Sequence, residues 1–167
     1  MRARARTETL QGLRDIAPVM AAAAPIGLIY GALALGKGMS AAEITGMSAL
    51  VYAGSAQFAA LGLWAPMPPV LALIASTLLI NLRHVLMSAS LGGRVQHWRP
   101  AERWLGFFLL VDETWAFAET RALKGPLSFA YFIAMSLAYW LNWVIWSDRK
   151  STRLNSSHTD ISRMPSS

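Results

Sequence analysis

Long stretches without a charged residue alternate with short polar segments along this chain. The three longest cover residues 16–36, 44–82 and 125–147. An α-helix rises about 1.5 Å per residue and the hydrocarbon core of a bilayer is about 30 Å thick, so about twenty apolar residues form a helix that crosses it. The middle stretch is long enough for two such helices. Because helices in soluble cores rarely stay uncharged over this length, the pattern predicts membrane-spanning helices.

Turn residues and charged loops divide these stretches into about five hydrophobic segments. The sequence therefore predicts an all-α fold, a polytopic membrane helical bundle in which some segments are broken or re-entrant. The segments are expected at about 16–36, 44–64, 70–91, 104–120 and 127–146. The first contains Pro18 and Pro25. Each proline removes one backbone hydrogen bond from a helix, so we expect this helix to be kinked or broken.

The composition agrees with a membrane location. Hydrophobic residues make up 54% of the chain and charged residues 14%, whereas about a quarter of a soluble domain is charged. The net charge of +6 would suit nucleic acid, but the arginines gather at the ends of apolar segments instead of forming one stripe, which disfavours that partner. Positive residues anchor the cytoplasmic side of membrane proteins, so the basic residues before the first segment predict a cytoplasmic N-terminus: Arg2, Arg4, Arg6 and Arg14.

Residues that commonly build cofactor sites are scarce. The chain contains no cysteine, and its histidines lack ligand spacing, so neither a metal site nor another cofactor is predicted. Amphipathic indoles prefer membrane interfaces, and five tryptophans are expected there: Trp98, Trp104, Trp140, Trp143 and Trp146.

The distribution of basic residues bears on the number of true spans. If all five segments cross the membrane, six basic residues lie on the cytoplasmic side and four on the other, with Arg83 left aside. If one of the first three segments is re-entrant, the counts become seven and three, which is a clearer cytoplasmic excess. We therefore favour re-entrance. Non-helical backbone at membrane depth is tolerated only where protein or a water-filled cavity covers it, so a break would mark a site.

Two acidic residues, Asp112 and Glu113, lie near the centre of the fourth segment. An ionisable group deep in an apolar helix costs about 2.5–3.5 kcal/mol on insertion scales, so such groups tend to face a cavity or a partner. Neighbouring helical residues point about 100° apart. We therefore expect one of the two to bind substrate or a coupling ion while the other packs. The alternative is a structural ion pair with Arg83.

Polar residues interrupt the third segment at Asn81, Arg83 and His84. The planar guanidinium of Arg83 suits a carboxylate, although an arginine near a helix end can instead extend its head to the interface. His84 is a candidate proton relay because histidine titrates near physiological pH. A hydrogen-bonded packing role is the alternative for this lone histidine.

Small and polar residues fall in the middle of the second segment: Gly54, Ser55 and Gln57. A helix broken there would present free N–H groups and its positive end to a substrate carboxylate. Hydrogen bonds between helices are the alternative use of these side chains. In the first segment, Pro25, Gly27 and Gly31 mark either an opening of the backbone or close helix packing.

Four runs resemble successive motifs of the AzlC family of branched-chain amino acid permeases, in order and in spacing. They are PIGLIYG at 25–31, VYAGSAQFAAL at 51–61, INLRHVLMSASL at 80–91 and FLLVDETWAF at 108–117. The resemblance implies a transporter of the bacterial inner (cytoplasmic) membrane that exports leucine, isoleucine and valine. It also implies a proton gradient as the driving force and a small AzlD-like membrane subunit as a partner in the bilayer.

Eight polar residues match the motifs of this family, and we assign them roles as hypotheses. Substrate binding falls to Gly54, Ser55, Gln57, Asn81 and Arg83. Ion or proton coupling falls to Asp112, Glu113 and His84. An intramembrane enzyme that uses these last three groups as acid and base is a rival interpretation, which no nucleophile motif supports.

After residue 147 the sequence becomes polar and loses its apolar periodicity. Residues 148–167 read either as a disordered tail or as translated sequencing adapter beginning at Asp148. We favour the adapter, which makes residues 1–147 the N-terminal part of a truncated transporter. An inactive fragment is a further interpretation of such a chain.

Overall fold

The computed structural model describes residues 2–65, 67 and 69–161, and the side chains of 3–65, 67 and 69–148. The elements in chain order are α1 (Arg2–Gly36), α2 (Ala41–Leu50), α3 (Gly54–Leu63), α4 (Val70–Gly92), η1 (Gly93–Val95), α5 (Pro100–Phe108), α6 (Asp112–Ala122) and α7 (Phe129–Ile161). No strand occurs in this part of the chain, which confirms the predicted all-α fold. α7 continues past residue 148, whereas 162–167 lie outside the described residues, and the origin of the tail stays a prediction.

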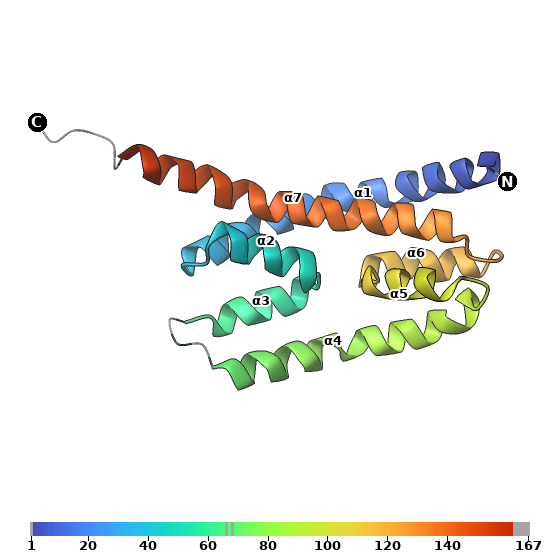
Figure 1. Ribbon diagram of the computed structural model, residues 1–167, viewed down its shortest axis with the longest axis horizontal. Coiled ribbons are helices and arrows are strands. Elements are labelled where there is room, and N and C mark those ends of the chain that lie inside the picture. Colours follow the sequence, from blue (N-terminus) through green and yellow to red (C-terminus); the bar gives the residue numbers. More distant parts are fainter. Residues whose placement is uncertain (1, 66, 68, 162–167) are drawn as a thin grey trace, which may run out of the picture.

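Among the described residues, three helices are long and apolar enough to cross a membrane: α1, α4 and α7. α1 and α7 lie side by side and run in the same direction, because Gly12 faces Tyr131 and Gly31 faces Ser147. α4 runs the opposite way, at the bottom of the view in Figure 1. These three helices form the frame in which the site is built.

The other four α-helices form two hairpins, α2–α3 and α5–α6 (Figure 1). Each of these helices has nine to eleven residues and is about 15 Å long, half the thickness of a hydrocarbon core. The hairpins enter from opposite ends of the molecule, and their turns, at residues 51–53 and 109–111, approach each other near its middle. The described part of the fold thus combines three long helices with two hairpins of short helices.

Two of the predicted segments need correction. Residues 44–64 and 104–120 are not single helices, because each stretch turns back at non-helical residues. The reversal within 44–64 is compatible with the favoured re-entrance, which stays a prediction, and the second hairpin was not expected. Asp112 and Glu113 consequently lie in the first turn of α6 and not at the centre of a helix. Apolar composition could not show this, since two half-length helices and one full-length helix have the same composition.

α1 continues through Pro18 and Pro25, so the helix is not broken at either proline. Pro25 deprives the carbonyl four residues earlier of its helical donor. One residue before that carbonyl, the side-chain amide of Asn142 in α7 donates to the Met20 carbonyl oxygen at 3.1 Å. This hydrogen bond ties α1 to α7 next to the proline, while the carbonyl that lost its helical donor is that of Ala21.

Local residues fix the two hairpins. At the start of α2 the Ser40 hydroxyl accepts from the Glu43 N–H at 3.2 Å, and the Glu43 carboxylate accepts from the Ser40 N–H at 2.7 Å. Tyr52, in the first turn, has a φ of +41°, a left-handed conformation that costs a side-chain-bearing residue about 1–2 kcal/mol. In the second turn the Thr114 hydroxyl accepts from the Val111 N–H at 3.0 Å. These contacts begin α2 and α6 and reverse the chain between α2 and α3.

Candidate functional site

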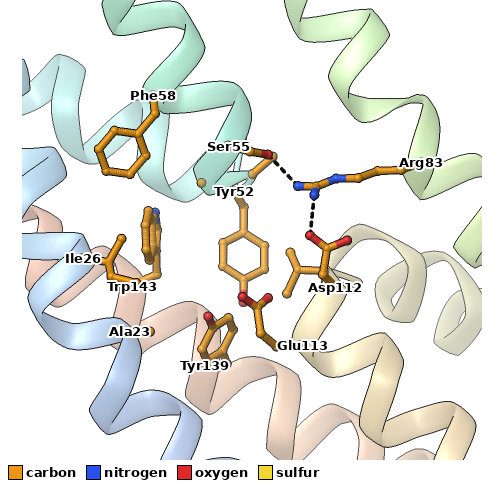
Figure 2. A pocket seen from close by; sticks show the side chains of 13 residues that line it. Ala23, Ile26, Tyr52, Ser55, Phe58, Arg83, Asp112, Glu113, Tyr139 and Trp143 are labelled. Carbon is orange, nitrogen blue, oxygen red and sulfur yellow. Dashed lines mark hydrogen bonds and ion pairs between the residues drawn. The ribbon is translucent and has the colours of Figure 1, made fainter.

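A cavity of about 240 Å³ lies where the two hairpin turns approach each other (Figure 2). Helices α1, α3, α4, α6 and α7 contribute to its lining together with both turns. Five residues that the sequence predicted for the site line it together: Gly54, Ser55, Arg83, Asp112 and Glu113. They come from three segments that are far apart in the sequence.

Arg83 of α4 connects the two hairpins across this cavity. Its Nη2 donates to the Ser55 Oγ of α3 at 2.6 Å, and its Nη1 forms an ion pair with the Asp112 carboxylate of α6. The guanidinium points toward the hairpin turns (Figure 2). The ion pair between Asp112 and Arg83, which was the alternative interpretation of the acidic residues, is therefore present.

The N-termini of two helices face the cavity. α3 begins at Gly54, and its N-cap residue, Ala53, provides no side-chain hydrogen bond. The first N–H groups of a helix have no intrahelical acceptor, and they give this end a partial positive charge. α6 begins with Asp112 and Glu113, whose carboxylates are favourable at a positive helix end. The end of α3 has no such acidic residue and is free to attract an anion.

Charged and apolar side chains lie on different sides of the cavity. Figure 2 shows the ion pair of Arg83 on one side and Ile26, Phe58 and Trp143 on the other, with the Tyr52 ring between them. The volume is below the roughly 300–1,000 Å³ of pockets for drug-sized ligands. The arrangement suits a small molecule with a charged end and an apolar end.

Three of the predicted site residues do not line the cavity: Gln57, Asn81 and His84. Gln57 is fully buried. Its Nε2 donates to the Ser48 Oγ at 3.3 Å, and its Oε1 accepts from the Trp143 indole N–H at 2.8 Å. These are the interhelical hydrogen bonds that the sequence left as the alternative for Gln57.

Gly27 and Gly31 lie in the contact between α1 and α7. A Cβ at Gly27 would be 3.0 Å from the Trp146 Cβ, and one at Gly31 would overlap the Ser147 carbonyl oxygen. Pro25 precedes them in the same continuous helix. Close helix packing, and not an opening of the backbone, therefore describes this stretch.

Aromatic residues of the site were missed from the sequence. Trp143 is buried and lines the cavity, a role that was not predicted for it. Trp98 is buried as well, and the interfacial depth expected for the five tryptophans stays a prediction. Tyr139 also lines the cavity. The spacing of Tyr139 and Trp143 was an available signal, because residues four apart share one face of a helix.

The amino-acid sequence that builds this site matches a known family. Residues 18–147 match the family described as AzlC protein. This chain belongs to the AzlC family. The inner membrane protein YgaZ of Escherichia coli (strain K12) is 25% identical over 138 residues, which are 81% of this chain and 56% of YgaZ. The chain thus spans about half the length of this curated relative. No solved structure matches the chain.

The stretch that matches the AzlC family includes every residue of the cavity lining, from Ala23 to Trp143. The resemblance of the four motifs to this family is therefore confirmed. The match, the inner-membrane relative and the three long apolar helices together make the chain an AzlC membrane protein.

Proposed function

We propose that this AzlC chain forms the substrate site of a secondary transporter that exports branched-chain amino acids. The observation that carries the proposal is the cavity between the hairpin turns, which is lined by a cation, two carboxylates, a helix N-terminus without a side-chain cap and an apolar wall. Secondary transporters bind substrate near the bilayer midplane, between discontinuous helices whose N-termini point at anionic groups. Valine, leucine and isoleucine carry both charges at one end and a hydrocarbon at the other.

The substrate carboxylate binds at the N-terminus of α3 and at Arg83. The first N–H groups of α3, from Gly54 onward, have no side-chain cap, and a guanidinium is the best side-chain partner for a carboxylate. Ser55 accepts from Arg83 at 2.6 Å. A substrate carboxylate replaces this hydroxyl as the acceptor, and the apolar substrate side chain then lies toward Phe58 and Ile26.

Glu113 receives the substrate ammonium or the coupling proton. It lines the cavity and forms no ion pair with another described residue, whereas Asp112 is already paired with Arg83. This division supports the expectation that the two neighbours have different roles. His84 lies outside the lining, which weakens the rival interpretation of an enzyme that uses all three groups.

The N-terminal end of α1 lies on the cytoplasmic side. The hairpin topology brings eight basic residues of the described side chains to this end and leaves only Lys37 at the other, with Arg83 between. The eight are Arg4, Arg6, Arg14, Arg94, Arg99, Arg103, Arg121 and Lys124. Such an asymmetry marks the cytoplasmic side. Export, the proton gradient and a small AzlD-like partner rest on the resemblance of the motifs.

Charge-neutralising variants test the two acidic residues separately. We expect Glu113→Gln to reduce the export of labelled valine from vesicles by about tenfold or more, which is the loss of one hydrogen bond to a charged group. Asp112→Asn should act through Arg83 and weaken valine binding as well. Glu119→Gln is the matched control, because Glu119 lies on the same helix but pairs with Arg94 outside the cavity. Wild-type export by both Glu113→Gln and Asp112→Asn would refute the proposed roles.

A further inference from the structure

The apolar side of the cavity is closed by the indole of Trp143. The residue is 6% exposed, and its ring lies against the start of α3, since a Cβ on Gly54 would be 3.2 Å from Trp143 Cη2. On another side it stacks with Tyr30 of α1, with ring centroids 6.3 Å apart and planes 26° apart. The ring is therefore held between three helices while one of its sides faces the cavity.

Gln57 fixes the rotation of this ring. Its Oε1 accepts the indole N–H at 2.8 Å, and its Nε2 donates to Ser48 at 3.3 Å. Ser48, Gln57 and Trp143 come from α2, α3 and α7, and the first two are fully buried. Hydrogen bonds are electrostatically stronger in a buried environment than in water, so this chain of two bonds favours one orientation of the indole. Gln57 does not line the cavity, and its hydrogen bond to Trp143 links it to a side chain that does.

We infer that Trp143 sets the largest apolar side chain that the site accepts, and that Gln57 is the positioning residue for its indole. The inference rests on the proposed amino acid site. A bulky residue that closes a pocket excludes larger ligands by steric overlap, and the backbone of α3 at Gly54 leaves the ring no room to retreat in that direction. A phenyl side chain needs space that the indole occupies, whereas an isopropyl group does not.

Two substitutions of opposite effect test the role of Trp143. Labelled valine and phenylalanine are bound at equilibrium to the full chain in lipid vesicles, and the ratio of the two dissociation constants is measured. Trp143→Phe removes part of the wall and should strengthen the binding of phenylalanine relative to that of valine by about tenfold. This is the low end of the range by which one methylene group changes discrimination in an apolar pocket. Gly54→Ala adds a methyl group beside the ring and should shift the ratio the other way. General misfolding cannot produce opposite shifts.

The role of Gln57 is tested by loss and rescue. Gln57→Met removes the acceptor of the indole N–H. It should therefore shift the ratio of the two dissociation constants in favour of phenylalanine, as Trp143→Phe does. Gln57→Glu, whose neutral acid keeps a carbonyl oxygen, should restore the wild-type ratio. Trp140→Phe is the matched control, because Trp140 donates to the Ala49 carbonyl at 3.0 Å and does not line the cavity.

The outcomes separate this inference from the proposed function. If wild-type protein binds valine but Trp143→Phe and Gly54→Ala leave the ratio unchanged, the role of Trp143 is refuted while the proposed site survives. If Gln57→Met and Gln57→Glu behave alike, the positioning role of Gln57 is refuted. If wild-type protein binds neither amino acid, the proposed substrate class itself is refuted.

Discussion

The ion pair between Arg83 and Asp112 predicts a specific pattern of stability in a double-mutant cycle. Arg83→Met leaves the Asp112 carboxylate without its cation, and Asp112→Asn leaves the guanidinium without its anion. Removing one partner of a fully buried pair costs about 3–5 kcal/mol, whereas an exposed pair contributes about 0.2–1 kcal/mol. The two side chains are 39% and 46% exposed, so screening should bring the coupling free energy close to the lower range. We expect about 1 kcal/mol.

The cycle needs the free energy of unfolding of four proteins in mixed micelles, measured by titration with a denaturing detergent. Arg83→Met should be the less stable single variant, because it also loses the hydrogen bond to Ser55. The double variant should be more stable than the sum of the two losses predicts. Losses that add within about 0.3–0.5 kcal/mol would show that the two charges are not coupled. Arg94→Met combined with Asp112→Asn is the control, and it should be additive because Arg94 pairs with Glu119.

The hairpin topology and the packing of α1 make further predictions. The chain has no cysteine, so single cysteines can be labelled with an impermeant maleimide: Lys37→Cys and Met67→Cys should react from one side of the membrane and Arg99→Cys from the other. A spanning segment at 44–64 would instead put the first two on opposite sides. Gly31→Ala should destabilise the protein by about 1–3 kcal/mol through overpacking, relative to Gly46→Ala, which has open space and gains up to about 1 kcal/mol of helix propensity. Equal thermal stability of the two variants would contradict the described packing.

The sequence predicted the long helices better than the hairpins for a physical reason. A spanning helix such as Val70–Gly92 is long and almost entirely apolar, with Arg83 as its single residue of fixed charge, and both properties are visible in the sequence. A half-length hairpin differs from a span only in its turn, and the first turn depends on a left-handed Tyr52, which no residue preference signals. Polar candidates such as Arg83 stood out because charge is rare in an apolar segment. Trp143 did not, because a buried and an interfacial tryptophan look alike in the sequence.

The opposed directions of the two hairpins explain the chemistry of the cavity. α1 with hairpin α2–α3 and α4 with hairpin α5–α6 form two units that run in opposite directions (Figure 1), so the positive ends of α3 and α6 both face the centre. The two turns then carry different residues: small ones at Gly54 and acidic ones at Asp112 and Glu113. In their charged forms Arg83, Asp112 and Glu113 carry together one excess negative charge. A zwitterionic substrate has no net charge and does not change this sum. A proton on Glu113 removes this excess charge, so the charge balance of the site agrees with the proton that the proposed function uses for coupling.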